Sequence, residues 1–397
     1  MRVALGVVFS MILATFPGCG GSDMPPAQQT EGGSVSTGYF VLWGDVHGHS
    51  AVTGHFCPDG MNDPRCPGLK GPEYYFQTAL DNGLDFAVIT DHAEDLTPAE
   101  WEQTKTAARL HDVPGVFVPF IGYEGAYASG ATPNYVNAWL VIFPDLNGGP
   151  VYAHESFKGR GRECPEDRMV SREAIWEGLR GSGAMGIFAH PPSNGIDWNF
   201  GPAERAAMIN VEVSSTGGRT AEDRYNWDGV LQGLGTGHKL GFSGSGNNHF
   251  ALAGADALTA VLATSLTREA IVDALKNRRM YAVNHERIKL WFELSDGDNV
   301  YLMGAEARVP VRGDGSTAVI TVSARATADK TPIRKVAVFR VQNGIEREIV
   351  SSEGSETIGS DELQPATGVS YYYARVYLRD TEAPMAWSSP IWVNVVP

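Results

Sequence analysis

The sequence LWGDVHGHS at residues 42–50 decides how the first part of the chain folds. Residues 40–43 form a short apolar run, and His47 and His49 follow it two positions apart. Alternate side chains of an extended segment project from the same face, so both imidazoles point toward one place. The pattern predicts a strand that presents two metal ligands at its end. A solvent-facing polar strand end is the alternative.

The same arrangement recurs up to about residue 285, where apolar runs alternate with helical patterns. Such alternation is typical of βαβ units with a parallel sheet. Carboxyl ends of strands converge in barrel and open α/β folds, so polar residues at these ends are expected to become neighbours. The polar residues that end the predicted strands, or follow the first of them, are Asp45, His47, His49, His55, Asp91, His92, Glu124, His190, Asn247 and His249.

This set of residues favours a transition-metal site. Imidazoles combined with a carboxylate suit Zn, Mn or Fe better than Mg or Ca, which prefer oxygen ligands. Asp45 and Asp91 are predicted to lie behind the ligands, where a carboxylate orients an imidazole by accepting its second N–H.

These motifs resemble the PHP (polymerase and histidinol phosphatase) superfamily of phosphoesterases. The first motif of that superfamily, His-x-His with a third His six residues later, is matched by His47, His49 and His55. Its later motifs are a TDH-like strand end, a Glu, further histidines and a terminal Asp-x-His. They are matched by His92, Glu124, His190 and the pair Asn247 and His249.

The resemblance implies a distorted (β/α)7 TIM-like barrel that holds one to three divalent ions of Zn, Mn or Fe. It implies three metal clusters that share some ligands. They are His55, His92 and His249; His47, His49 and Glu124; and Glu124 with His190. A closer resemblance, to PHP-like exported bacterial proteins of unassigned activity, covers nearly the whole exported chain. It is carried by residues 42–50, 89–94, 268–290 and 386–392.

Two departures from the superfamily pattern bear on the chemistry. Asn247 stands where the motif has Asp, and its amide offers a carbonyl oxygen without a charge. Tyr135 occupies the place of a further His, for which His154 is a substitute candidate. Weak candidates for substrate binding are His154, Arg160, Arg162 and Arg219. Solvated surface is the alternative for the arginines.

The chain changes its pattern after a helix predicted to begin behind Thr267 as N-cap. Residues 288–294 alternate apolar and polar side chains as a half-buried strand does, and Asn343-Gly344 is a hairpin signal. Residues 39–287 are therefore predicted to form the metal-binding barrel and residues 288–397 a β-sandwich. The sandwich aromatics, such as Tyr371 and Trp387, are interpreted as core, with a carbohydrate platform as the alternative.

The first residues are interpreted as an export signal. Residues 1–18 resemble a bacterial lipoprotein signal peptide that ends before Cys19, the predicted lipidation site. An ordinary secretory signal is the alternative. Residues 19–38 are predicted to be a flexible tether, which leads to an exported protein anchored by lipid to the periplasmic or outer-membrane face. Cys57 and Cys66 are predicted to form a disulfide, with Cys164 left over.

The overall charge limits the partners. A net charge of −15 opposes nucleic-acid binding. The predicted membrane contact is the lipid anchor alone, and the predicted partner is a small phosphoester. The leading hypothesis is an exported metal-dependent phosphoesterase. An amidohydrolase-like metal hydrolase and a metal-poor pseudoenzyme that acts as a surface binding protein are the alternatives.

Overall fold

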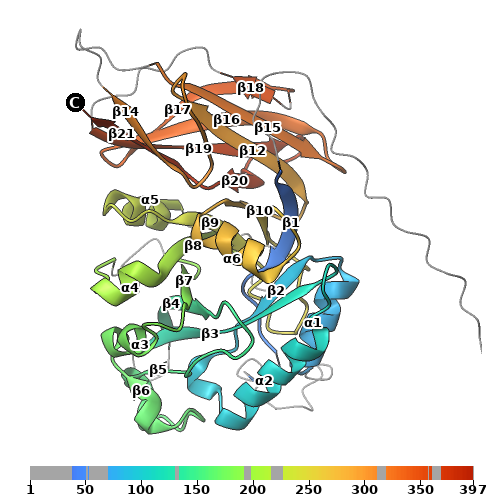
Figure 1. Ribbon diagram of the computed structural model, residues 1–397, viewed down its shortest axis with the longest axis vertical. Coiled ribbons are helices and arrows are strands. Elements are labelled where there is room, and N and C mark those ends of the chain that lie inside the picture. Colours follow the sequence, from blue (N-terminus) through green and yellow to red (C-terminus); the bar gives the residue numbers. More distant parts are fainter. Residues whose placement is uncertain are drawn as a thin grey trace, which may run out of the picture. The chain divides into compact units, whose positions relative to one another are not determined.

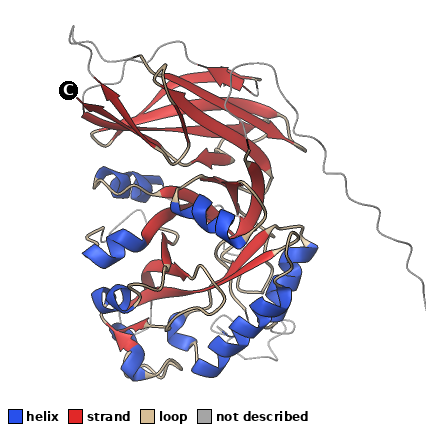
Figure 2. Cartoon of the chain, in the orientation of Figure 1, coloured by secondary structure: helices blue, strands red, loops and turns tan. Residues whose placement is uncertain are grey.

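The computed structural model describes residues 38–50, 52, 70–129, 134–191, 198–215, 227–310, 319–355, 357–359 and 368–396. They lie within one compact unit, residues 37–397. Helices and strands are mixed up to residue 276, and the described elements after it are strands, so the predicted α/β class is confirmed (Figures 1 and 2). The signal peptide, Cys19, the tether up to residue 37, His55, Cys57, Cys66 and Arg219 lie outside the described residues, as does the side chain of Tyr135.

Seven strands of the first part form one hydrogen-bonded path, β1-β2-β3-β4-β7-β8-β9. They are β1 (Phe40–Asp45), β2 (Phe86–Ile89), β3 (Val118–Ser129), β4 (Asn134–Ile142), β7 (Met185–Phe188), β8 (Met208–Ser215) and β9 (Gly241–Ser245). The sets β1-β2-β3 and β7-β8-β9 are parallel. Parallel neighbours put their carboxyl ends at one edge, which is what the site requires.

Strand β4 departs from the predicted parallel sheet, because it runs antiparallel to both β3 and β7. Four residues connect β3 to β4. A parallel crossover needs a dozen residues or more, so the chain can only turn back on itself here. The parallel arrangement expected from the alternating pattern therefore does not hold at this strand.

The strand path does not close into a complete barrel. On its free side, β1 pairs antiparallel with β10 (Leu258–Ala263), which pairs with β11 (Met280–Val283). The residues that follow β1 and β9 meet at a single bridge between Gly48 and Asn248. A closed TIM-like ladder is therefore not confirmed by the described strands.

The helices cover these strands, and some of them begin at a capping side chain. The longer ones are α1 (Pro72–Asp81), α2 (Pro98–His111), α5 (Trp227–Gly235) and α6 (Arg268–Lys276), and the shorter ones are α3 (Arg172–Gly178) and α4 (Pro202–Ala207). Thr97 and Glu100 form a capping box at α2, and Thr267 caps α6 as predicted.

The C-terminal part contains two sets of strands. One sheet has the order β13-β12-β15-β18, formed by β12 (Ile288–Ser295), β13 (Val300–Leu302), β15 (Thr321–Ala328) and β18 (Thr357–Gly359). The other set is β14 (Glu306–Pro310), β16 (Ile333–Gln342), β17 (Ile345–Glu353), β19 (Gly368–Leu378), β20 (Ala386–Ser388) and β21 (Ile391–Val396). Strand β20 pairs with β11, so this second set continues the sheet of the first part.

The core is shared by both parts. One cluster of buried apolar side chains includes Tyr75 on α1 and also Trp387 on β20. The aromatic residues in question are buried, which confirms their interpretation as core; they are Tyr371, Tyr372, Tyr373, Trp387 and Trp392. No helix among the described residues combines the length and the apolar character needed to cross a bilayer.

Candidate metal centre

The ends of the strands bring the predicted polar residues together. His47 and His49 follow β1, His92 follows β2, and Glu124 lies within β3 beside His92. His190 follows β7, and the pair Asn247 and His249 follows β9. Residues spread over 200 positions of sequence therefore surround one place.

Two groups of side chains have the arrangement of metal ligands. The first is His49, His92 and His249, and the second is His47, Glu124 and His190. Within each group, the atoms that could bind a metal lie within 4.8 Å of one another. These groups partition the ligands differently from the superfamily resemblance, which places His49 with His47.

The carboxylate of Glu124 links the two groups. Its Oε2 atom lies 3.3 Å from Nε2 of both His47 and His49, and 3.6 Å from Nε2 of His92. Its Oε1 atom lies 3.1 Å from Nε2 of His190. One carboxylate oxygen that faces several imidazole nitrogens from both groups has the geometry of a bridging ligand.

The donor set fits a divalent transition metal. Nε2 of His49 lies 3.1 Å from Nε2 of His47 and 3.2 Å from Oδ1 of Asn247, and Nε2 of His92 and His249 are 3.4 Å apart. A neutral imidazole has one N–H, so these converging nitrogens and oxygens present more lone pairs than protons. A cation satisfies such a set, and nitrogen with carboxylate oxygen suits Zn, Mn or Fe.

Glu212 was not among the predicted site residues, yet it supports the second group. It is buried on β8, and its Oε1 atom accepts a hydrogen bond from Nδ1 of His47 at 2.9 Å. The same carboxylate accepts the backbone N–H of His190 at 2.7 Å and the hydroxyl of Ser245 at 2.5 Å. The sequence signal for Glu212 is its position between two valines, Val211 and Val213, because a carboxylate inside an apolar strand needs a partner.

Asp45 does not have the predicted role. Its carboxylate accepts backbone N–H groups of His47, Gly246 and Gly254 at 3.1–3.2 Å rather than an imidazole N–H. It therefore ties the segment after β1 to the segment after β9. Burial raises the pKa of Asp45 to about 6, although these hydrogen bonds lower it.

Asp91 accepts the backbone N–H and the hydroxyl of Ser50, which fixes the chain behind His49.

The electrostatics of the centre separate its members into charged and neutral groups. Burial lowers the pKa of His47, but the carboxylates of Glu212 and Glu124 outweigh it and raise that pKa to about 10. A metal would have to displace the proton on Nε2 of His47 in order to bind there. Burial and the neighbouring His249 and His92 hold the pKa of His49 well below its usual value. His49 thus keeps the lone pair that a metal ligand needs.

Glu124 is ionised in spite of its burial. Burial raises its pKa, but His92 and His47 hold it well below the usual value of a glutamate. Glu94 behaves in the opposite way, because burial followed by Asp95 raises its pKa well above the usual value. The Oε1 atom of Glu94 lies 3.5 Å from Nδ1 of His92, so Glu94 is a second supporting residue that the sequence did not single out.

The backbone is strained at two of the candidate ligands. His190 has φ 26° and Asn247 has φ 44°, both in the left-handed region. Non-glycine residues rarely adopt such angles, and each costs on the order of 1–3 kcal/mol. Strain of this kind is concentrated at functional sites, where it directs a side chain that a relaxed backbone would point elsewhere.

The weaker candidates for substrate binding lie outside the two groups. His154 is hydrogen-bonded to Ser156 through Nδ1, and its ring packs against Tyr127 at 4.2 Å between centroids. Arg160 is exposed and donates to the carbonyl of Ser156, whereas Arg162 pairs with Asp95 at 3.1 Å. The exposure of Arg160 is what the solvated-surface alternative predicts.

Comparisons with known proteins give no match to a family model and none to a curated protein. Among solved structures, the chain is similar to a two-domain protein from Bacteroides vulgatus described as containing a predicted PHP-like metal-dependent phosphoesterase. The two are 15% identical with a TM-score of 0.43, over 89% of this chain and 96% of that one. A candidate metal-dependent phosphoesterase from Bifidobacterium adolescentis is 13% identical with a TM-score of 0.30, over 53% of this chain and 88% of that one.

Proposed function

We propose that this protein is a metal-dependent phosphoesterase. The observation that carries the proposal is the carboxylate of Glu124, which contacts imidazoles of two adjoining ligand groups. Two metal sites that share a carboxylate are a common arrangement in enzymes that transfer or hydrolyse phosphoryl groups.

Each of the two groups of side chains would supply the ligands of one ion. His49, His92 and His249 would hold one ion, and His47, Glu124 and His190 another, with Glu124 between them. A bound divalent ion supplies a water of lowered pKa and positive charge for the phosphoryl oxygens. Glu212 keeps a proton on Nδ1 of His47 and so directs Nε2 toward Glu124. His190, Asn247 and His249 are only partly buried, so a substrate would approach from their side.

The remaining parts of the proposal concern architecture and location. We propose that residues 39–287 form a distorted TIM-like barrel and residues 288–397 a β-sandwich. We also propose that residues 1–18 are removed and that Cys19 carries a lipid. The apolar stretch before Cys19 supports this. Loss of membrane association in a Cys19→Ala variant would test the anchor.

The test of the proposed function begins with metal content. Protein that starts at Gly20, purified without chelator, is analysed for Zn, Mn and Fe and assayed on p-nitrophenyl phosphate, bis-p-nitrophenyl phosphate and p-nitrophenyl acetate. We expect at least one bound ion per chain and hydrolysis of a phosphoester. In Glu124→Gln, metal content should fall and activity should drop on the order of 100-fold or more.

The matched control is His111→Ala, which removes an imidazole from α2 outside the site. It should keep both metal and activity. Protein that binds no metal even after reconstitution would contradict the proposal. Activity on the acetate ester alone would favour a carbonyl hydrolase instead.

A further inference from the structure

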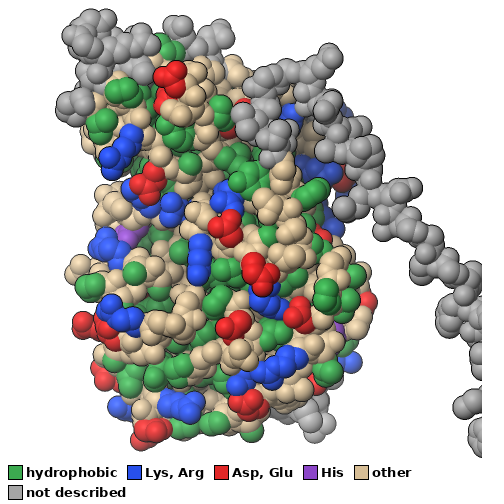
Figure 3. All heavy atoms as spheres, viewed as in Figure 1, with side chains coloured by type: hydrophobic (Ala, Val, Ile, Leu, Met, Phe, Trp, Pro, Cys, Tyr) green, Lys and Arg blue, Asp and Glu red, His purple; other side chains and the backbone are tan. Residues whose placement is uncertain are grey.

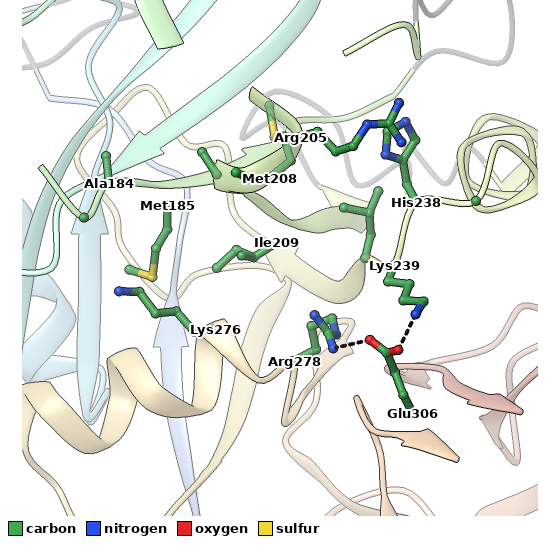
Figure 4. Close-up of a pocket in the computed structure, with 15 residues that line it drawn as sticks. Ala184, Met185, Arg205, Met208, Ile209, His238, Lys239, Lys276, Arg278 and Glu306 are labelled. Atoms are coloured by element: carbon green, nitrogen blue, oxygen red, sulfur yellow. Dashed lines mark hydrogen bonds and ion pairs between the residues drawn. The ribbon is translucent and has the colours of Figure 1, made fainter. Parts of the chain in front are cut away.

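A cavity lies at the opposite ends of the strands that build the metal centre. It has a volume of about 610 Å³ and is lined by residues at the starts of β7, β8 and β9. Its lining also includes the last turns of α4 and α6 and the start of β14 (Figure 4). A volume of this size accommodates a small organic molecule.

The cavity is distinct from the metal centre. Met208 lines it at the start of β8, whereas Glu212 on the same strand contacts His47. Four residues of a strand span roughly 13 Å. Because β7, β8 and β9 are parallel, all three run from this cavity toward the metal ligands.

Four cationic side chains line the cavity, against one carboxylate. The cations are Arg205, Lys239, Lys276 and Arg278, and the carboxylate is Glu306. This local excess of positive charge contrasts with the net charge of −15 of the whole chain. Lys and Arg side chains are visible over α5 and α6 in Figure 3, with acidic side chains among them. A cavity with an excess of positive charge attracts anions.

The cations fall into two pairs. Glu306 forms ion pairs with Lys239 and Arg278, as Figure 4 shows. Neither Arg205 nor Lys276 forms an ion pair with any of the residues that the structure describes. Two cations thus remain available to an anionic ligand, and two more become available if the ligand displaces Glu306.

Arg278 is held in place for such a role. Its backbone has φ 58°, its Nε donates to the carbonyl of Gly304 at 3.2 Å, and its guanidinium stacks over the ring of Trp392 at 5.3 Å. A guanidinium fixed in this way loses little freedom on binding a carboxylate or phosphate. Met185, Met208 and Ile209 add apolar surface to the same cavity.

We propose that this cavity binds a small organic molecule that carries two or more phosphate or carboxylate groups. The cations come from different elements and so favour a ligand with more than one negative charge. The apolar side chains of Met185, Met208 and Ile209 favour a carbon skeleton between those charges. The site does not take part in the proposed hydrolysis, since it lies at the other end of the sheet. It is a second binding site of the protein.

The test is isothermal titration calorimetry of protein that starts at Gly20, at low ionic strength. The probes are fructose 1,6-bisphosphate and citrate, with glucose as the uncharged control. We expect saturable binding of at least one anion and none of glucose. The double variant Arg205→Ala/Lys276→Ala should bind that anion on the order of 10-fold more weakly or worse. The control Lys289→Ala/Arg347→Ala removes the same charges from exposed strand positions elsewhere and should bind as the wild type does.

Two further variants separate the alternatives. Glu306→Gln releases Lys239 and Arg278, so it should tighten binding, a result that a damaged fold would not give. His47→Ala alters the metal centre and should leave anion binding unchanged. The proposal is overturned if neither anion binds the wild type, or if Arg205→Ala/Lys276→Ala binds as the wild type does. It is equally overturned if His47→Ala alone abolishes binding.

Discussion

At the scale of single residues, Asn247 limits the charge of the metal centre. Its Oδ1 atom reaches Nε2 of His49 at 3.2 Å, so the side chain already occupies the position of a ligand. An amide oxygen carries no net charge, whereas a carboxylate adds a full negative charge at almost the same place.

Asn247→Asp is therefore expected to bind a divalent metal more tightly, on the order of 10-fold or more. Asp tolerates the left-handed backbone at this position nearly as well as Asn, so the fold should persist. Competition with a chromogenic chelator measures the affinity. Asn147→Asp, at an exposed position, is the control. Unchanged or weaker affinity would show that Asn247 is not a ligand.

Glu212 acts on the metal centre through His47. Glu212→Gln keeps the size of the side chain but removes the charge that holds the imidazole N–H. Loss of such a supporting carboxylate typically costs 10- to 100-fold in metal affinity, so we expect a decrease of about this size. The same chelator competition measures it, with Glu353→Gln on the exposed end of β17 as control. Equal affinities in the two variants would rule out this role.

Cys164 should be chemically inert in the folded protein. It is a free, buried cysteine, and burial raises its thiol pKa from 9.0 to about 11. The fold favours the neutral thiol, so the contribution of Cys164 to stability is present below pH 9 and is lost as the pH rises toward 11. At neutral pH the native protein should not react with a thiol reagent, since the thiolate is the reactive form.

A thiol count tests this together with the predicted disulfide. Protein that starts at Gly20 and is denatured without reductant should show one thiol per chain, that of Cys164, if Cys57 and Cys66 are paired. Three thiols would contradict the pairing. Rapid labelling of the native protein at neutral pH would contradict the protection of Cys164.

At the scale of elements, the β3–β4 hairpin positions Glu124. Gly122 lies two residues before Glu124, and a Cβ atom there would lie 2.3 Å from the carbonyl oxygen of Val141. The two strands approach so closely at this point that only glycine fits.

Gly122→Ala should therefore separate the strands and destabilise the protein by about 1–3 kcal/mol. Urea unfolding measures the loss, and metal content should fall with it because Glu124 moves. Gly359→Ala is the matched control, since a Cβ atom there meets no heavy atom. A Gly122→Ala variant as stable as this control would mean that the hairpin adjusts freely.

The sequence predicted the ends of the strands better than their directions. His47, His92 and His190 could be placed because apolar runs stop just before them, a local signal. The antiparallel course of β4 depends on the short connection to β3, and no periodicity of apolar residues encodes it. Glu212 could not be assigned from pattern, because a carboxylate in an apolar strand becomes meaningful only when its partner is known. Asp45 was misassigned for a similar reason, since its partners are backbone groups up to 209 residues away.

At the scale of the whole molecule, the two parts depend on one another. Strand β20 pairs with β11 in register from Tyr281 opposite Ser388 to Val283 opposite Ala386. Side chains from both parts also belong to one buried cluster. Removal of residues 288–397 would expose an unpaired strand edge and part of this core.

Residues 38–397 are accordingly expected to unfold in a single cooperative transition, followed by circular dichroism with heating. Residues 38–287 alone should show no such transition and should bind a dye for exposed apolar surface. Two resolved transitions of the longer chain, or a cooperative transition of the shorter one, would show that the parts fold independently. The intact protein carrying Lys289→Ala serves as a control for surface changes.

The pairing of β11 with β20 also has a consequence for biosynthesis. A ribosome delivers β11 long before β20, because the whole segment from Asn284 to Met385 lies between them. Throughout that interval one edge of β11 has no native partner, and an unpaired edge readily recruits strands from other chains. A premature stop in the last part of the gene would thus yield a polypeptide prone to aggregate, and chaperone demand should peak just before the final strands emerge.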